Sequence, residues 1–150
     1  LVRKFGGSAD DSTDRVDTLL NHESGLLGLS GGRSGNMKEL LNDSSDLSKD
    51  AASAYCYRTR KYVGAYLAAL GGADGIVFGG GVGENAAFIR SRTLGGLERL
   101  GIHIDNERNA IQSESPFRIS AAGSPIEVWV TPVDEASVIV REVEDLVASQ

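Results

Sequence analysis

The chain has 150 residues, which is enough for one domain with a hydrophobic core. Its hydrophobic content of 41% and charged content of 24% are ordinary for a soluble globular protein, and its net charge of −6 argues against a nucleic-acid partner. Cys56 is the only cysteine, which excludes an intrachain disulfide, and no apolar run approaches the roughly 20 residues of a membrane span. With no signal peptide visible at Leu1, we expect a cytoplasmic protein without a membrane partner.

Only brief helices are expected in the first third of the chain. Ser12 or Thr13 can cap a short helix. Gly25–Leu29 combines small and apolar residues without a helical period, Gly31–Asn36 is a loop, and Met37–Leu41 makes a helical turn.

The strongest helical pattern runs from about Ser48 to Leu70. Apolar and aromatic residues keep helical spacing along it, at Ala51, Tyr55, Tyr62, Val63, Tyr66 and Leu70. Basic residues at Arg58, Arg60 and Lys61 can stay solvated. We interpret Cys56, on the same helix, as a packing residue and not as a nucleophile.

The second half of the chain alternates strands and helices, which indicates an α/β fold. Gly75–Phe78 fits a short buried strand, and Ile126–Val130 fits a second strand. Between them we expect a helix from Glu84 to about Leu100, weakened at Gly95-Gly96. Its expected buried residues are Phe88, Ile89, Leu97 and Leu100. The remaining expected elements are a strand or edge at Gly101–Asp105, a short strand at Phe117–Ile119 and a final helix at Val133–Ser149.

Glycines crowd the stretch between the first of these strands and the helix after it, at Gly79, Gly80, Gly81 and Gly83. A strand, a glycine loop and a helix in succession bring backbone close to a nucleotide, because missing Cβ atoms allow close approach and unusual φ angles. Glu84 would offset the helix dipole that holds a phosphate, so the loop suits a nucleoside better than a terminal triphosphate.

Two other interpretations of this loop stay open. The loop can be a connection without a ligand, in which Glu84 is an ordinary acid at a helix start. Alternatively, Gly81, Gly83 and Ala86 fit the dinucleotide-binding fingerprint, with Asp105 at the place of the acid that binds the ribose. A carboxylate at Glu84 facing a pyrophosphate argues against that second alternative.

The chain contains three segments, FGGGVGEN with the helix after it, Leu19–Gly31 and Val130–Val143, that resemble segments of the acetokinase family of acetate, propionate and butyrate kinases. FGGGVGEN followed by Phe88, Ile89 and Arg90 looks like the adenosine-binding signature of that family. LLNHESGLLGLSG at Leu19–Gly31 and VTPVDEASVIVREV at Val130–Val143 are similar to two further family segments, in the family's order and at about its spacing.

This resemblance implies an actin/hexokinase/Hsp70-like (ribonuclease H-like) kinase with two α/β domains. The chain, residues 1–150, would be part of the C-terminal nucleotide-binding domain, and the N-terminal domain would be absent. The implied reaction is the reversible, Mg²⁺-dependent phosphorylation of acetate by ATP to give acetyl phosphate. The residues that stabilise the transferring phosphoryl group would lie upstream of Leu1, so we expect no catalytic residue in this chain and no activity from it alone.

The resemblance also implies site residues. Gly79, Gly80, Gly81, Val82, Gly83, Glu84 and Asn85 would lie along the adenosine and inner phosphates of ATP. Asn36, Met37 and Lys38 occupy the loop that flanks adenine in the family, where Asn36 replaces an acid and Lys38 an arginine. Glu135 stands at a glutamate that helps to bind Mg²⁺; Ala136 replaces a second acid, and Asp134 and Glu135 are equally explained as helix-start acids.

The expected partners are ATP or ADP, a short-chain carboxylate and a second copy of the chain. Tyr55, Tyr62, Tyr66 and Trp129 are the aromatic residues most able to anchor a homodimer, although Trp129 also suits a core. Alternative functions are a propionate or butyrate kinase, a non-catalytic truncated module and a dinucleotide-binding oxidoreductase domain.

Overall fold

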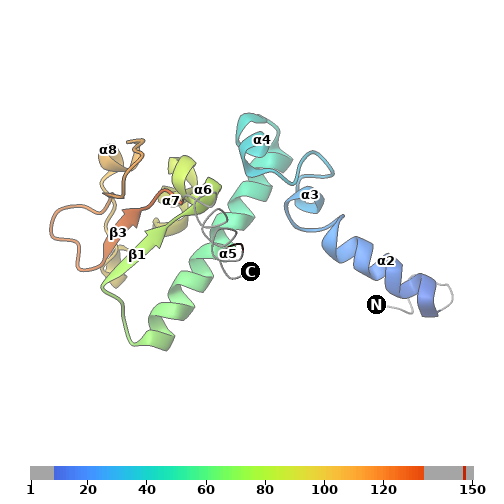
Figure 1. Cartoon of the computed structure of the whole chain (residues 1–150), viewed down its shortest axis with the longest axis horizontal. Helices are drawn as coiled ribbons and strands as arrows, with labels where there is room; N and C mark the ends of the chain where they lie inside the picture. Colours follow the sequence, from blue (N-terminus) through green and yellow to red (C-terminus); the bar gives the residue numbers. More distant parts are fainter. Residues whose placement is uncertain (1–8, 134–146, 148–150) are drawn as a thin grey trace. The chain divides into compact units, whose positions relative to one another are not determined.

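The computed structural model describes residues 9–133 and residue 147 (Figure 1). The chain divides into two compact units, Leu1–Ala69 and Leu70–Gln150, and each is described by itself. The expected final helix at Val133–Ser149 lies almost wholly outside the described residues.

The described part of the first unit is helical. Its elements are α2 (Ala9–Asn21), α3 (Gly25–Leu29), α4 (Met37–Asn42) and α5 (Asp46–Leu70). The long helix and the turn at Met37 are confirmed. Gly25–Leu29 was expected to be irregular but forms a single helical turn, with the Ser30 N–H donating to Leu26 O. One turn is too short to show a helical period in the sequence.

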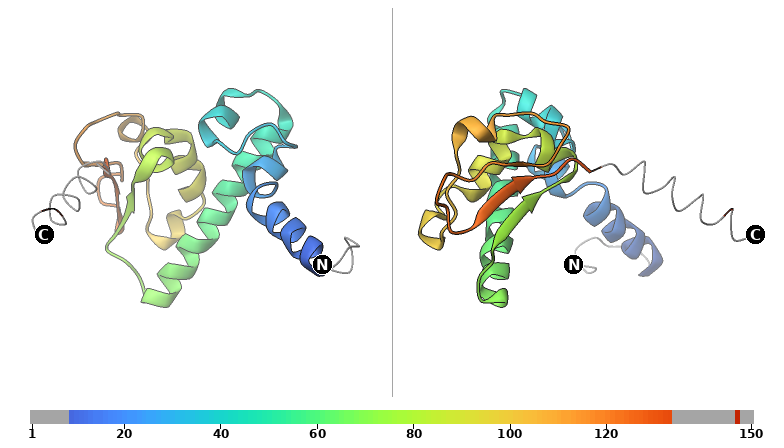
Figure 2. Two further views of the ribbon diagram at one scale, coloured as in Figure 1. Left: turned by 45° about the vertical axis from the view of Figure 1, so that its right-hand side comes forward. Right: turned by 60° about the vertical axis from the view of Figure 1, so that its left-hand side comes forward.

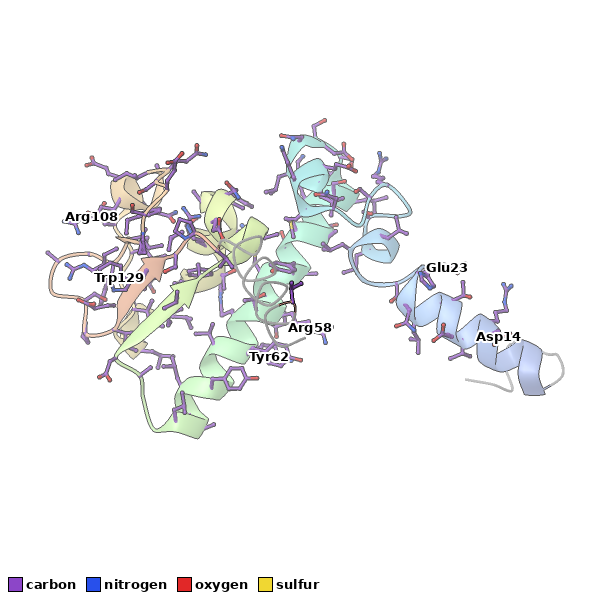
Figure 3. All side chains as sticks on the ribbon, in the orientation of Figure 1. Asp14, Glu23, Arg58, Tyr62, Arg108 and Trp129 are labelled. Carbon is purple, nitrogen blue, oxygen red and sulfur yellow. The ribbon has the colours of Figure 1, made fainter. Side chains whose placement is uncertain are left out.

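Helix α5 turns a different face inward from the one its aromatic residues suggest. Its buried residues are Ser48, Ala51, Ala52 and Cys56. Tyr62, Tyr66 and Leu70 are instead 51%, 64% and 73% exposed. The two tyrosine rings stack at a centroid distance of 6.4 Å. The Arg58 guanidinium lies 5.9 Å from the Tyr62 ring, and Figure 3 labels both of these residues on α5. Ser48, Ala52 and Cys56 are four residues apart and therefore share one face of the helix. The packing role of Cys56 agrees with its burial.

In the described part of the second unit, a three-stranded sheet forms the centre, in the order β1-β3-β2. Strand β1 (Gly75–Phe78) runs parallel to β3 (Glu127–Val130) (Figure 2). Gly75 lies opposite Glu127, and Phe78 lies opposite Val130. Strand β2 (Phe117–Arg118) pairs antiparallel with β3. The strand expected at Gly75–Phe78 is thus confirmed, the one expected at Ile126–Val130 begins one residue later, at Glu127, and the one expected at Phe117–Ile119 is present as Phe117–Arg118. The alternating segment at 101–105 contributes isolated bridges, from Ile102 to Ile126 and from Ile104 to Ser120.

The expected single helix from Glu84 to Leu100 is wrong. The structure has α6 (Gly80–Asn85), α7 (Ala87–Leu94), the 3₁₀ turn η1 (Glu98–Leu100) and, further on, α8 (Asn106–Asn109). Helical structure begins at Gly80, ahead of the expected start, and breaks at Ala86, whose φ and ψ are −111° and 78°. The break changes the phase of the buried face, so Ile89 is buried as expected while Phe88 and Leu100 are 53% and 52% exposed.

The described core of the second unit lies on one face of the sheet. Along β3, Val128 and Val130 are buried, whereas Glu127 and Trp129 are half-buried on the other face. Other buried apolar residues of this unit are Ile89, Leu94, Ile102, Ile119 and Ile126. Burying one such side chain contributes about 1.5–3 kcal/mol. Strand β1 was expected to be buried but is only partly so, since Val77 is 66% exposed. It is an outer strand of the described sheet.

Candidate functional site

Two loops meet where the parallel strands β1 and β3 end. Since parallel strands share a direction, the segments that follow Phe78 and Val130 leave the sheet at the same edge (Figure 1). The Thr131 N–H donates to Phe78 O at 2.9 Å and ties the two exits together. Open α/β sheets bind ligands in the crevice just outside the carboxyl ends of their parallel strands.

The glycines of the first loop have different structural reasons. Gly80 has φ = +71°, which side chains rarely adopt. A Cβ atom on Gly79 would lie 3.0 Å from Val133 Cγ2, and one on Gly83 would lie 3.3 Å from the backbone of Phe78. Gly81 is unlike these three, because a Cβ atom there would meet no atom of the described residues within 4 Å and its φ is ordinary. Within the described part of the chain, neither packing nor backbone conformation therefore explains the glycine at position 81.

Glu84 does not stand at a helix start, contrary to its expected position. It is the penultimate residue of α6, and its side chain folds back to the start of that helix. Its Oε1 accepts hydrogen bonds from Gly80 N at 2.9 Å and from Val133 N at 2.8 Å. The amide at the N-terminus of α6 therefore already has an anionic partner. Asn85, the last of the residues expected to lie along the adenosine and inner phosphates, donates its side-chain N–H to Gly81 O at 3.0 Å and is exposed.

Arg90, whose structural role the sequence did not reveal, holds the other end of α6. Its guanidinium donates from Nη1 to Gly83 O and Glu84 O, each at 2.8 Å, and so caps the last carbonyls of the helix. Nε donates to Asn109 Oδ1 at 2.8 Å, and Nη2 donates to Asn109 O at 2.6 Å. Arg90 is 1% exposed, and burial lowers the pKa of its guanidinium.

A hollow of about 370 Å³ lies beside the C-terminal end of α6 and the exit of β3. Its lining combines side-chain amides, a hydroxyl, carboxylates and apolar groups, from Glu84, Asn85, Gln112, Ser113, Glu114, Phe117, Val130 and Pro132. Pockets that bind small molecules combine apolar walls with a few polar groups in this way. The volume lies within the usual range of ligand pockets, about 300–1,000 Å³.

The predicted adenine-flanking segment belongs to the first unit. Asn36 caps α4, and its Oδ1 accepts from Lys38 N at 2.9 Å. The Met37 side chain is buried at 4% exposure, whereas Lys38 is exposed. Of these three side chains, Lys38 alone combines exposure with a charge that can face a ligand.

The predicted magnesium residue, Glu135, lies outside the described residues, as does Asp134. Within residues 9–133 and 147, no three His, Cys, Asp or Glu side chains gather closely enough to hold a metal ion. A Mg²⁺ ion bound mainly by water and phosphate oxygens, with one or two carboxylates, does not require such a cluster. In the same residues, every helix is too short or too polar to span a lipid bilayer.

Asp105, which the dinucleotide interpretation assigns to the ribose, has another role. Its Oδ1 accepts from Glu107 N and Arg108 N at the start of α8, and its Oδ2 lies 3.6 Å from Arg108 Nε. The carboxylate serves as a helix cap. This arrangement weakens the dinucleotide alternative.

The chain is similar to acetate kinases in sequence. A family model described as the acetokinase family matches residues 5–141. An acetate kinase from Clavibacter sepedonicus is 46% identical over 136 residues, which cover 89% of this chain and 34% of that protein. The chain thus spans about a third of the length of the curated relatives that it matches.

Solved structures agree with the sequence comparison. An acetate kinase from Porphyromonas gingivalis superimposes with a TM-score of 0.81 at 34% identity, over 98% of this chain and 36% of that one. A propionate kinase from Francisella tularensis gives 0.69 at 33% identity, over 81% of this chain and 31% of that one. The fold is therefore actin/hexokinase-like, and the chain covers part of a domain of that fold. With the family model matched over residues 5–141 and a relative 46% identical across most of the sequence, this chain belongs to the acetokinase family.

Proposed function

We propose that the chain is the C-terminal nucleotide-binding portion of a longer kinase that transfers a phosphoryl group from ATP to acetate. The observation that carries this proposal is the open side of Gly81, in a loop at the carboxyl ends of two parallel strands. Membership of the acetokinase family supplies the reaction class. The chain contributes the wall of the site that faces adenosine, and the remainder of the longer polypeptide contributes the groups that act on the transferring phosphoryl.

In this proposal the backbone from Gly79 to Asn85 lies along the adenosine, with Gly81 at the closest approach. Lys38 places a positive charge near the adenine base. Asn36 and Met37 shape the loop that carries Lys38. Glu135 helps to hold Mg²⁺ through its carboxylate, and the ion neutralises phosphate charge when bound. Acetate is the first choice of substrate, because the named relatives include many acetate kinases. Propionate and butyrate stay alternatives, since a propionate kinase is also among the similar structures.

We further propose that the longer kinase is a cytoplasmic homodimer. The exposed rings of Tyr62 and Tyr66 on α5 are consistent with a contact surface, because tyrosines anchor many protein interfaces. Trp129 is a weaker candidate, because its Nε1 donates to Glu127 Oε2 within the sheet at 2.9 Å. Light scattering of the longer kinase that finds only monomer at high concentration would refute the dimer.

The test of the nucleotide site is Gly81→Val in the longer kinase. The new side chain meets open space among the described residues, so the loop itself should keep its conformation while ATP loses its closest approach. We expect the KM for ATP to rise about tenfold or more, which corresponds to about 1.4 kcal/mol. The matched control is Gly64→Val on α5, because Gly64 also has open space and an ordinary φ. An unchanged KM in a folded Gly81→Val enzyme would remove this loop from the site.

A further inference from the structure

The side chain of Glu84 connects two segments that are far apart in the sequence. One oxygen atom, Oε1, accepts from Gly80 N in α6 and from Val133 N after β3, at 2.9 Å and 2.8 Å. The same two segments are also packed together, since a Cβ atom on Gly79 would lie 3.0 Å from Val133 Cγ2. The carboxylate therefore sits at the junction of both exits from the sheet.

Helix α6 needs such a connection, because its sequence disfavours a helix. Its six residues, GGVGEN, include glycine at positions 80, 81 and 83, and glycine is among the poorest helix formers. Hydrogen bonds to a carboxylate are stronger than those between neutral groups. Glu84 thus supplies a strong acceptor to a helix end that would otherwise lack one within the described residues.

We propose that Glu84 is a positioning residue, whose carboxylate fixes the spacing between the glycine loop and the segment that starts at Thr131. This inference rests on the proposed function. Glu84 acts on nucleotide binding through the backbone of α6, and its carboxylate makes no contact with the nucleotide. Val133 lies two residues before Glu135, the proposed magnesium residue. The hydrogen bond from Val133 N to Glu84 therefore fixes the backbone two residues ahead of Glu135.

Two substitutions separate positioning from direct contact. Glu84→Ala removes the acceptor, so the Gly80 and Val133 amide protons should exchange faster with solvent, and both together. The KM for ATP of the longer kinase should rise about tenfold, while kcat changes less. Glu84→Gln keeps an oxygen that can accept the same two hydrogen bonds without the charge. It should restore amide protection at both positions and bring KM to within about threefold of the unchanged protein.

Glu98→Ala is the matched control. Glu98 Oε1 accepts from Gly96 N at 3.0 Å, a bond of the same chemical type in the same unit and outside the proposed site. This variant should leave the KM for ATP unchanged. A Glu84→Ala enzyme that melts at a lower temperature but keeps its KM would overturn the proposal and leave a purely structural role.

A second result would also overturn it. If Glu84→Gln restores both protected amides and still raises KM as much as Glu84→Ala, the charge itself contacts the ligand. Gly81→Val distinguishes failure of the proposed function from failure of the positioning role. If Gly81→Val keeps the KM for ATP of the unchanged enzyme, the loop is not a nucleotide site. If Gly81→Val raises this KM but Glu84→Ala does not, only the positioning role is refuted.

Discussion

Replacing Asn109 with alanine should strongly destabilise the second unit, although Asn109 lies on the short helix α8. Asn109 is 4% exposed, and its Oδ1 accepts from Arg90 Nε at 2.8 Å. Its side-chain N–H also donates to Ala87 O at 2.9 Å. Asn109→Ala thus leaves a buried guanidinium N–H without an acceptor, at a position where no described carboxylate forms an ion pair with Arg90.

The magnitude follows from the two hydrogen bonds that are lost. A hydrogen bond to a charged group contributes about 1.5–3 kcal/mol, and one between neutral groups about 0.5–1.5 kcal/mol. We therefore expect Asn109→Ala to lower the free energy of unfolding by about 2–4 kcal/mol. The double variant Arg90→Met with Asn109→Leu removes both polar side chains at similar volume, and the backbone carbonyls that they cap lose those donors. Its free energy of unfolding should fall by less than the sum of the losses in Arg90→Met and Asn109→Leu, because the double variant leaves no buried charge unpaired.

Urea unfolding followed by tryptophan fluorescence measures these differences. Trp129 is the only tryptophan and lies half-buried on β3, so the signal reports on the second unit (Figure 3). Arg108→Ala, next to Asn109 on α8, is the control, because its ion pair with Asp105 is partly exposed and contributes about 1 kcal/mol or less. If Asn109→Ala is no more destabilising than Arg108→Ala, the Arg90 network does not hold α6 in place.

Three other predictions concern pH, magnesium and activity. The Ser48 hydroxyl and the Ser45 backbone and hydroxyl donate to Asp43 and lower its pKa from 3.8 to about 2. The charged carboxylate therefore stabilises the fold fully above about pH 4, and this contribution decreases as the pH falls toward 2. The difference in Tm between the unchanged chain and Asp43→Asn should therefore shrink over that range, and a difference that is constant with pH would contradict this assignment. Glu135→Ala in the longer kinase should raise the Mg²⁺ concentration needed for half-maximal rate and lower kcat; a lower Tm alone would favour a helix-start role. The 150 residues alone should form no acetyl phosphate from ATP, Mg²⁺ and acetate, and turnover that Gly81→Val abolishes would refute that expectation.

The sequence predicted the order of elements better than their faces. The strand at Gly75–Phe78 and the strand ending at Val130 were both expected, because short apolar runs bounded by turns are a local signal. Their adjacency, and therefore the place of the glycine loop at the sheet edge, needs long-range pairing. Helix α5 was likewise expected, but its buried face depends on small residues such as Ala52, which carry little signal in a hydrophobic pattern.

Helix α6 could not be predicted from local propensity. Its glycines predict a loop, and the bonds that hold its ends come from side chains whose direction the sequence does not reveal. Arg90 reaches back to carbonyls six and seven residues earlier, and its other partner, Asn109, lies 19 residues further on. The open side of Gly81 is equally hidden, because neighbouring glycines that look the same in sequence are explained by packing or by φ.

The charges at the two ends of α6 bear on what the loop can bind. Glu84 places a carboxylate at the N-terminal amide of Gly80, and Arg90 places a guanidinium on the last carbonyls, so each charge complements the partial charge of its helix end. An N-terminus that already has an anionic partner attracts a phosphate less than a free one does. The sequence also favours a nucleoside, although it places Glu84 at a helix start. The structure places Glu84 near the end of α6, but its folded-back side chain still brings the carboxylate to the N-terminal end of that helix, so the loop keeps its preference for a nucleoside.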